Sequence, residues 1–394
     1  MGNGHLYPML PLCSELAVRG YRVTCASSDR YSRLVRATDA EPLPFLETPV
    51  DEALRIENEA RAQLPVNDPS RFETTQLELQ WLSRSADSFL AQIAPFYGAN
   101  PPDLVLYSRY SIPGRIIAQR FDVPAVQLSA HFAYPGETRF WERGVARNPD
   151  GIVAYAAKLD ALLATHGVTR TGNLWHVEPM NIHFIPGAFQ YRRELFDERF
   201  VFACSPLERR IRTAWRRPDC RRPIVLISGY SGLAQTQVSN LHYFRLCIDA
   251  LADAPFHCVL SIGNGFPAHA LGPLPANFDI NERASHLEIL PHVDLLVCHG
   301  GMSSSIEALY NGVPVLGIPG TPYMEEVAWR VAELQVGTLL PQHELCARSL
   351  REAVMQMLND RSLGERAKEM QRLLARCDPV ARAADRVDLF AKKA

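Results

Sequence analysis

The sequence predicts an α/β protein built from two domains with parallel sheets. In the N-terminal half, apolar runs such as "YRVTCAS" (21–27) and "DLVLYS" (103–108) are typical of strands, and "GRIIAQRF" (114–121) is typical of an amphipathic helix. The alternation stops at residues 205–223 and restarts at "IVLISG" (224–229). Strands that alternate with helices pair in parallel, with helices on both faces of the sheet. Two such halves joined by a linker imply a cleft, and ligands of such sheets bind at the carboxyl ends of the strands.

Length and composition agree with a globular protein of this size. The chain has 394 residues, enough for two to three domains of ~150 residues. Its net charge is −2, with 47% hydrophobic and 21% charged residues, so no polyanion such as nucleic acid is expected as a partner. Residues 205–223 contain seven arginines. Because no basic excess occurs elsewhere, this stretch is interpreted as a solvated linker and not as a nucleic-acid patch.

The cysteines indicate a reducing environment. Nine cysteines are scattered without a C-x-x-C pair or a Cys/His cluster at metal spacing. This pattern predicts reduced, mostly buried thiols in a cytoplasmic protein, with no metal site. No apolar run approaches the ~20 residues that span a bilayer, so no stable membrane insertion is expected.

The stretch "CHGGMSSSIEALYNGVP" (298–314) carries the main functional signal. An apolar strand buried on both faces is predicted before His299, and Gly300 and Gly301 allow a tight exit into a helix that begins near Ser303 and Ser304. Free backbone N–H groups at a helix start, together with the helix dipole, suit a phosphate. An alternative is an ordinary capping box, in which the side chains of Ser304 and Glu307 only close the first turn.

The wider sequence resembles a known enzyme family. Residues 286–340, with "HGGMSSSIEALYNGVPVLGIPGTP", are similar to the nucleotide-sugar signature of the inverting macrolide- and plant-type glycosyltransferases. The blocks "NGHLYPMLPLCSELAVRGYRVT" (3–24) and "PPDLVLYSRYSIPGRIIAQRFDVPAVQLS" (101–129) resemble their N-terminal domain. The resemblance implies the GT-B fold, in which two Rossmann-like domains face each other across a cleft, the first binding the acceptor and the second the donor. The expected divisions are an acceptor domain at 1–205, a linker at 206–223, a donor domain at 224–377 and a C-terminal helix at 378–394 that packs back on the first domain.

The resemblance also implies roles for individual donor-site residues. His299 and the turn of Ser303 to Ser305 are expected to hold the donor diphosphate, and Glu307 to accept hydrogen bonds from the ribose hydroxyls. Arg283 stands where many members stack a tryptophan on the base, and His286 stands where a glutamine reads the base edge. The full expected donor-binding set is Ser231, Arg283, His286, His299, Gly301, Ser303, Ser304, Glu307, Tyr323 and Met324.

Glycosyl transfer with inversion needs a base for the acceptor hydroxyl and stabilisation of the leaving diphosphate. His5, in "GNGHLYP", matches the family's base. Ser108 stands where members carry the aspartate that orients this histidine, and a serine cannot balance an imidazolium charge. His131 and Asp29 are alternative partners. Because the chain has no D-x-D triplet, we expect no metal and no cofactor beyond the nucleotide-sugar donor, which is a co-substrate.

The start of the chain departs from the family. Members have an inner strand before the loop that holds the base, but only four residues precede His5, fewer than the ~5–6 residues of a typical strand. We therefore expect either a native polypeptide that is longer at its N-terminus or a sheet that lacks an inner strand and leaves backbone groups unpaired.

Further differences from the family indicate which sugar and which acceptor the protein uses. Tyr323 and Met324 stand where members present an Asp-Gln pair to the hydroxyls of a glucose-like sugar, which favours a deoxyhexose linked to thymidine or uridine diphosphate. Alternatively, Glu325 or Glu326 restores the contact. The irregular segments 48–80 and 129–145 are expected to shape a pocket for a lipophilic, macrolide- or polyketide-like acceptor.

Two other functions compete with a transferase. A catalytically silent homologue, acting as an auxiliary or binding protein, agrees with the missing aspartate and the missing first strand, but the intact cradle and His5 favour a transferase. A sugar-nucleotide epimerase of the same architecture lacks its expected carboxylates.

Overall fold

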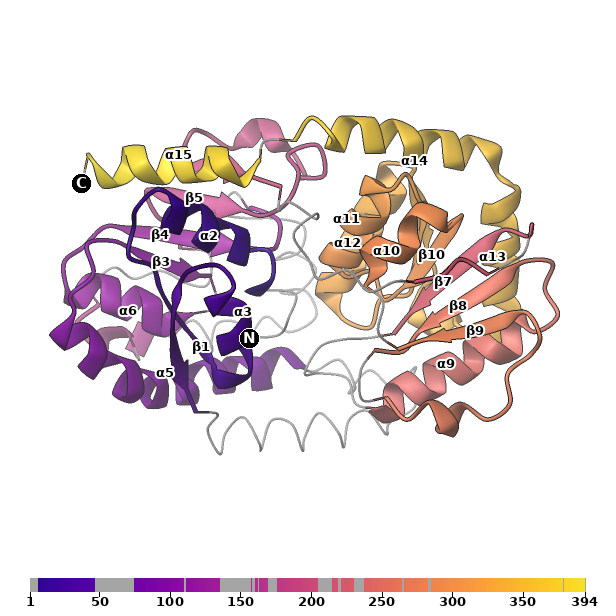
Figure 1. Cartoon of the computed structure of the whole chain (residues 1–394), viewed down its shortest axis with the longest axis horizontal. Coiled ribbons are helices and arrows are strands. Elements are labelled where there is room, and N and C mark those ends of the chain that lie inside the picture. The colour runs from indigo at the N-terminus through magenta and orange to yellow at the C-terminus, as the bar shows by residue number, and fades with distance from the viewer. Residues whose placement is uncertain are drawn as a thin grey trace. The chain divides into compact units, whose positions relative to one another are not determined.

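The chain divides into two compact units, each with parallel strands covered by helices (Figure 1). Unit 1 comprises Met1–Ile56, Glu73–Pro206 and Cys377–Ala394, and unit 2 comprises Glu57–Phe72 and Leu207–Arg376. The computed structural model describes residues 6–46, 74–109, 111–134, 157, 160–161, 163–168, 176–204, 215–218, 221–229, 237–263, 266–282, 285–377 and 379–393.

Unit 1 contains two parallel sheets, β1-β2 and β3-β4-β5-β6. Its strands are β1 (Thr24–Ser28), β2 (Glu41–Phe45), β3 (Val105–Ser108), β4 (Ala125–Ser129), β5 (Met180–His183) and β6 (Phe200–Phe202). Its α-helices are α2 (Leu10–Val18), α3 (Ser32–Arg36), α5 (Thr74–Ala99), α6 (Ile112–Arg120) and α15 (Val380–Ala391), with short 3₁₀ turns η1 (Asp29–Tyr31) and η3 (Arg193–Leu195). Several strands lie within the predicted apolar runs.

The two sheets of unit 1 share one hydrophobic core although their strands do not pair. Within the described residues, no strand joins β1 to β3. Ala26 of β1 and Val105 of β3 nevertheless pack against the same cluster, which includes the buried Ile93 of α5 and Ile116 of α6. Apolar burial therefore holds β1 and β3 on one helical layer without a shared ladder of hydrogen bonds.

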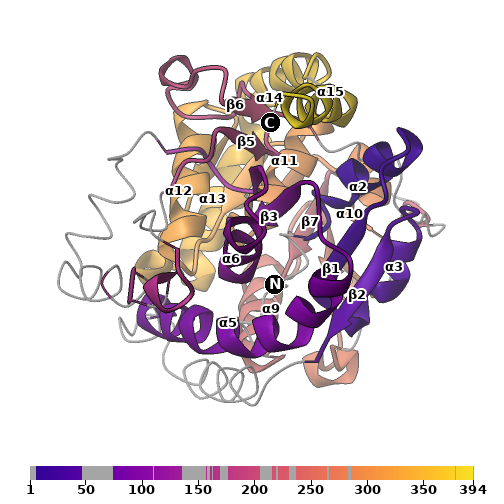
Figure 2. The same ribbon diagram turned by 90° about the vertical axis from the view of Figure 1, so that its left-hand side faces the viewer.

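Strand β2, "EPLPF", was not predicted, because two prolines argue against a central strand. The N–H of Glu41 donates to the carbonyl oxygen of Val23 on the side of β1. Backbone nitrogens alternate between the two sides of a strand, so those of Pro42 and Pro44 face away from β1. In the described sheet no strand pairs with β2 on that side, so the missing N–H groups of the two prolines cost no hydrogen bond there. Figure 2 shows β2 beside β1 and α3.

The C-terminal helix α15 packs on α2 within unit 1 (Figure 1). Val380 and Ala384 of α15 join Leu12 and Leu16 of α2 in a buried cluster that also contains apolar side chains of β4 and β5. At the end of α2, the guanidinium of Arg19 lies 2.7 Å from a carboxylate oxygen of Asp385 and 2.6 Å from one of Asp388. These ion pairs raise the pKa of Arg19.

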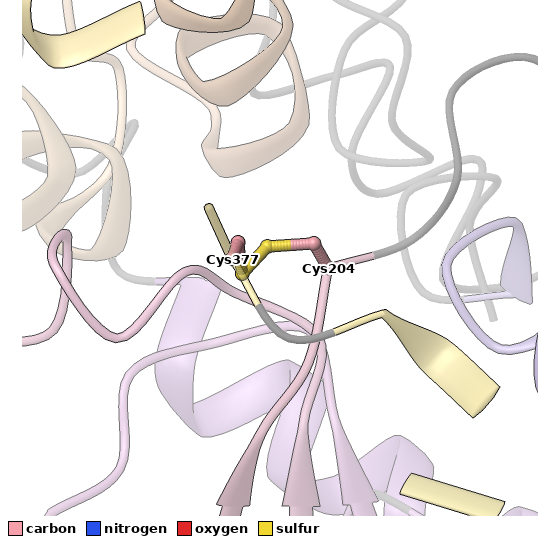
Figure 3. Close-up of a disulfide and its surroundings, with 2 residues drawn as sticks. All are labelled: Cys204 and Cys377. Carbon is pink, nitrogen blue, oxygen red and sulfur yellow. A yellow bond between two sulfur atoms is a disulfide. The ribbon is translucent and has the colours of Figure 1, made fainter. Parts of the chain in front are cut away.

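A disulfide joins Cys204, which follows β6, to Cys377, which precedes α15 (Figure 3). The expectation that all cysteines are reduced thiols is therefore wrong for this pair. Their Cα atoms lie 6.0 Å apart although 173 positions separate them in the sequence. Pairing over such a separation leaves no local sequence pattern.

The other described cysteines are free thiols, as expected. Burial raises the pKa of Cys247 to about 12 and that of Cys298 to about 11, so both stay protonated. Cys13 of α2 and Cys25 of β1 share a hydrogen bond, which raises the pKa of Cys13 and lowers that of Cys25.

Unit 2 is built on one parallel sheet with the strand order β12-β11-β10-β7-β8-β9. Its strands are β7 (Ile224–Ser228), β8 (His257–Ser261), β9 (Phe278–Asn281), β10 (Leu295–Cys298), β11 (Val315–Gly317) and β12 (Gly337–Leu339). Its helices are α9 (Gln237–Leu251), α10 (His286–Ile289), α11 (Met302–Tyr310), α12 (Pro322–Glu333), α13 (Ala347–Asn359) and α14 (Arg361–Leu374), with 3₁₀ turns η5 (Ala268–Leu271), η6 (Leu290–His292) and η7 (Gln342–Glu344). The predicted apolar run at 224–229 contains β7, and the strand predicted before His299 is β10.

Helices α9 and α13 pack on the sheet of unit 2 and form with it the largest hydrophobic cluster described. Phe244 of α9 and Val354 of α13 are buried in this cluster. On other elements of this unit, α11 contacts α14, and α12 contacts β11 and β12. Among the described residues, no helix is both long enough and apolar enough to cross a bilayer.

His183 of β5 makes the stability of unit 1 depend on pH. Burial lowers the pKa of His183 to about 3, whereas a histidine in an unfolded chain titrates near ~6.5. Between these values the unfolded chain binds more protons than the folded one, so the free energy of unfolding falls as the pH falls below about 6.5. We expect this group to remove about 2 kcal/mol between pH 7.5 and pH 5, measured by urea denaturation.

The substitution His183→Asn tests this assignment. Asparagine keeps a donor near the position of Nδ1, which lies 2.9 Å from the carbonyl oxygen of His131, but does not titrate. The variant should therefore lose less stability over the same pH interval. The exposed His343 provides the control, because His343→Asn should retain the full wild-type dependence. An unchanged pH dependence in His183→Asn would rule out His183 as its source.

Candidate active site

The site in unit 2 lies where the strand order reverses. From β7 the chain adds β8 and β9 on one side and then crosses over to place β10 on the other side of β7. Ligands of open α/β sheets bind at such a point, beyond the carboxyl ends of the two strands. His299 follows β10 there, and Gly229 follows β7.

Gly300 turns the chain from β10 into α11. Its φ of +71° lies in the left-handed region, which favours glycine. A Cβ atom on Gly300 would also lie 3.0 Å from the carbonyl oxygen of Met324 and 3.3 Å from the Cβ atom of Ala328. A Cβ atom on Gly301 would collide with the ring of His299. Neighbouring atoms therefore crowd a Cβ atom at both glycine positions. This agrees with the tight turn between strand and helix that was predicted from the sequence.

Helix α11 begins at Met302, one residue earlier than predicted, and Gly301 is its N-cap. No side chain caps this end, so the first-turn N–H groups have no hydrogen-bond acceptor from a capping side chain. The alternative of a capping box formed by Ser304 and Glu307 is wrong, because Ser304 is already the third helical residue and Glu307 lies in the body of the helix. A helix start that has no capping side chain and is preceded by glycines is suited to binding an anion.

The three consecutive serines of α11 differ in accessibility. Ser303 and Ser304 are half-buried, whereas Ser305 is fully buried beside Cys298. Only the hydroxyls of Ser303 and Ser304 are thus partly open to a ligand at the helix start. Ser305 belongs to the packing between α11 and β10.

Three ionisable side chains gather beside this helix start. Glu307 is buried, and its Oε2 lies 3.8 Å from Nδ1 of His286, the first residue of α10. His299 is also buried. Burial, and secondly the nearby His286, lower the pKa of His299 to about 4, so it is neutral near pH 7. A neutral imidazole can donate one hydrogen bond to a phosphate oxygen without a proton being taken up first.

The first turn of α12 lies against the same glycine. Thr321 is the N-cap, and its hydroxyl accepts a hydrogen bond of 3.3 Å from the N–H of Met324. The carbonyl oxygen of Met324 is the atom nearest to a Cβ on Gly300. Tyr323 and Met324 are both half-buried, so part of each residue is open to solvent.

In unit 1, Ser108 ends β3 and is buried. Of its two predicted substitutes, Asp29 accepts a hydrogen bond of 3.0 Å from the hydroxyl of Ser32, which ties it to the start of α3. His131 is buried, and its backbone N–H donates to Ser129 Oγ at 3.1 Å. Three predicted site residues, His5, Ser231 and Arg283, lie outside the described residues.

Sequence reasoning missed a buried polar network on the sheet of unit 1. The hydroxyl of Tyr107 donates to Glu178 Oε1 at 2.5 Å, and His176 Nε2 lies 3.2 Å from the same carboxylate. Burial first, and then the carboxylate, raise the pKa of Tyr107 well above its ordinary value. Tyr107 directly precedes Ser108, so this network fixes the end of β3. The only signal in the sequence was a tyrosine at an inward position of an apolar strand.

Comparison with known proteins identifies the family. Residues 245–388 match the family described as Erythromycin biosynthesis protein CIII-like, C-terminal domain. The NDP-glycosyltransferase YjiC of Bacillus licheniformis is 31% identical over 98% of this chain and 95% of its own length. The chain belongs to the macrolide-type glycosyltransferases. Within this family, the demethyllactenocin mycarosyltransferase of Streptomyces fradiae is 30% identical over 98% of this chain and 84% of its own length.

Solved structures agree with this assignment. CalG4, the calicheamicin glycosyltransferase, has a TM-score of 0.79 and 31% identity, covering 100% of this chain and 96% of its own. The predicted GT-B fold and the predicted inverting glycosyltransferase are confirmed, and nothing in these relatives supports a silent homologue. The donor of this macrolide-type glycosyltransferase is a nucleotide sugar. Within the described residues, no group of three or more His, Cys, Asp and Glu side chains is placed to hold a metal ion.

We predict that His299→Ala and Glu307→Ala each weaken the binding of UDP or dTDP by at least ~10-fold, because each removes a hydrogen bond to a charged or polar ligand group. Isothermal titration calorimetry on the folded variants measures the dissociation constant. Glu333→Ala is the control, because Glu333 is an exposed residue of α12 paired with Arg330. An unmoved dissociation constant in Glu307→Ala, together with a lowered melting temperature, would make Glu307 a structural residue only.

Proposed function

We propose that this macrolide-type glycosyltransferase transfers a deoxyhexose, with inversion, from a thymidine- or uridine-linked donor to a hydroxyl group of a lipophilic natural product in the cytoplasm. The single observation that carries the choice of sugar is the first turn of α12. There, the carbonyl oxygen of Met324 lies close to Gly300, which precedes the uncapped start of α11, and Tyr323 is the residue before Met324.

The start of α11 is proposed to hold the donor diphosphate. The backbone N–H groups of the first turn and the hydroxyls of Ser303 and Ser304 supply donors, and His299 supplies one more. Leaving-group departure places negative charge on the diphosphate, and fixed donors stabilise this charge without reorganising. Glu307, buried 3.8 Å from His286, is suited to accept hydrogen bonds from ribose hydroxyls. Ser231, Arg283 and Gly301 complete the proposed donor site.

His5 is proposed to remove the proton of the acceptor hydroxyl as that oxygen attacks the anomeric carbon. The C1–O bond to the diphosphate breaks as the new glycosidic bond forms on the opposite face, which inverts the configuration. Ser108 is proposed as the partner of His5. A serine oxygen can accept the imidazole N–H but offers no charge to balance the imidazolium, so the base is weaker than one paired with a carboxylate.

The sugar follows from hydrogen-bonding capacity. A phenol and a thioether cannot replace the carboxylate and amide that hold two sugar hydroxyls, and each unpaired buried hydroxyl costs ~1–3 kcal/mol. A deoxysugar, with a methyl or methylene group in place of hydroxyls, avoids part of this cost. The N–H of Met324 is capped by Thr321 and its carbonyl oxygen lies close to Gly300, so the backbone of this turn is constrained. Tyr323 and Met324 are proposed to face the sugar from this turn.

The acceptor is proposed to be apolar. In the described part of the segment after β4, Phe132 packs on Phe189 with ring centroids 5.7 Å apart. The side chain of Gln190 binds both backbone groups of Ala133 at 2.9 Å. These contacts anchor the beginning of the aromatic segment 129–145, and apolar lining with few polar groups is typical of small-molecule pockets.

We predict that His5→Ala lowers kcat by at least ~10²-fold, the usual contribution of a positioned base, while donor affinity stays nearly unchanged. Steady-state kinetics measure kcat, and calorimetry with the free nucleoside diphosphate measures binding. Retained turnover would refute the assignment.

Ser108→Asp gives the complementary test of the same pair. A carboxylate beside His5 should raise the pKa of the imidazole and shift the acidic limb of the kcat/KM profile to higher pH. Ser108→Ala, which removes the acceptor without adding charge, is the matched comparison. An unmoved profile in both variants would mean that another residue already serves as the partner.

We predict that a deoxyhexose nucleotide has a higher kcat/KM than UDP-glucose. Competing donors, offered side by side to purified enzyme with one acceptor, measure the ratio. The double substitution Tyr323→Asp/Met324→Gln should move the ratio toward UDP-glucose by at least ~10-fold, because it restores hydroxyl-binding groups. Glu325→Gln and Glu326→Gln test the alternative. If either variant loses activity with UDP-glucose but keeps it with the deoxyhexose donor, that glutamate is the hydroxyl-binding group. A higher kcat/KM for UDP-glucose than for the deoxyhexose nucleotide in the wild type refutes the proposal.

A further inference from the structure

The disulfide Cys204–Cys377 lies where the chain leaves unit 1 and where it returns. Unit 1 ends at Pro206, two residues after Cys204, and resumes with Cys377 itself. The connecting segments on both sides of Leu207–Arg376 are thus joined covalently at the edge of unit 1.

The disulfide also anchors the start of helix α15. Cys204 pairs with Pro379 as a parallel bridge, so the returning segment extends the edge of the sheet beyond β6. Figure 3 shows the two cysteines bridging the end of this strand and the returning segment. Helix α15 begins at the next residue, Val380. The covalent bond therefore fixes the first turn of α15 on unit 1.

Helix α15 in turn supports α2. The contact uses Val380, Ala383, Ala384 and Val387, of which two are alanines with little apolar surface. Its ion pairs are formed by Arg19 with carboxylates that are partly or largely exposed, and such pairs contribute little. A helix of 12 residues is marginal in water when it is not held in place. Docking of α15 therefore depends strongly on the fixed first turn.

We propose that the Cys204–Cys377 disulfide is a redox-controlled staple that keeps α15 docked on α2, and that its reduction releases α15 and lowers transferase activity. The activity part rests on the proposed function, because α2 begins five residues after His5. When α15 leaves, Leu12 and Leu16 of α2 lose their contacts with Val380 and Ala384 and keep only those with β4 and β5. We expect this loss to loosen α2, which follows His5 in the sequence.

The chemistry requires a dithiol reductant. Cys377 is half-buried and Cys204 is buried, so an attacking thiolate reaches Sγ of Cys377. The attack forms a mixed disulfide and breaks the S–S bond, and Cys204 leaves as a thiolate that takes up a proton. The second thiol of the reductant then displaces Cys377 as a thiol. The reductant is oxidised to its disulfide and supplies both electrons.

The remaining cysteines of the described chain offer controls for this reaction. Cys247 and Cys298 are buried thiols whose pKa values are raised by burial, which makes them inert. Cys346 is exposed at the N-cap of α13, where its hydrogen bonds with Ser349 lower the pKa of the thiol. Cys346→Ala therefore removes the most accessible free thiol described without touching α15.

The experiment compares the wild type, Cys204→Ala/Cys377→Ala and Cys346→Ala, each with and without dithiothreitol. Hydrogen exchange of α15 and α2 reports docking, and mass spectrometry of the Cys204 and Cys377 peptides reports the state of the bond. In the wild type and in Cys346→Ala, reduction should speed exchange in α15 at least ~10-fold. It should also lower the melting temperature by about 5 °C or more. The double variant should behave like the reduced protein in both conditions.

Activity separates this proposal from the proposed function. Reduction should lower kcat in the wild type and leave the dissociation constant of UDP or dTDP unchanged, because unit 2 holds the nucleotide site. Faster exchange in α15 from a chain without transferase activity would support the staple and refute the proposed function. Unchanged exchange after the bond is shown to be open would overturn the staple. So would free thiols at Cys204 and Cys377 in protein prepared under oxidising conditions.

Discussion

The close approach at Gly300 constrains the proposed nucleotide site of unit 2. A left-handed backbone and a carbonyl oxygen 3.0 Å from where a Cβ atom would lie strongly favour glycine at this position. Because the turn is this tight, α11 starts directly behind β10, and its first N–H groups point to the carboxyl edge of the sheet. The same approach brings the first turn of α12 against the turn. One backbone conformation therefore sets both the anion-binding helix start and the side chains beside it.

Sheet order determines which strand ends meet at this place. Strand β10 lies between β7 and β11, and its residues are fully buried, so packing on both faces fixes its position. The pairing of β10 with β7 joins segments that are about seventy residues apart, as Leu295 opposite Val225 illustrates. The side chain of Asp294 reinforces this pairing, since it accepts a hydrogen bond of 2.8 Å from the N–H of Ile224. Long-range strand pairing thus places the site, although the glycine–serine motif that forms it lies within one short stretch of the sequence.

The sequence was most informative where burial is continuous and least informative where pairing is remote. Strands of unit 2 read as apolar runs because both of their faces are covered, and the glycines after β10 marked the turn. Strand β2 carries two prolines that an edge position tolerates, so its composition argued against a strand. The disulfide joins residues 173 positions apart, a partnership that spacing cannot reveal. The helix start showed why Ser304 does not cap: the Gly301 backbone already occupies the N-cap.

In the proposed donor site, backbone groups and side chains have different roles. Backbone N–H groups at the start of α11 attract a diphosphate whatever sugar it carries, because the charge they bind is common to all nucleotide sugars. On α12, by contrast, the constrained atoms are the carbonyl of Met324 and its N–H, which Thr321 caps. The side chains of Tyr323 and Met324 are half-buried, whereas the contacts with Thr321 and Gly300 use backbone atoms of Met324. In the proposed donor site, substitution at Tyr323 or Met324 changes the hydrogen-bonding groups offered to the sugar, whereas substitution of Gly300 strains the left-handed turn itself. In this proposal, the choice of sugar belongs to Tyr323 and Met324, whose side chains are not part of the close backbone contact with Gly300.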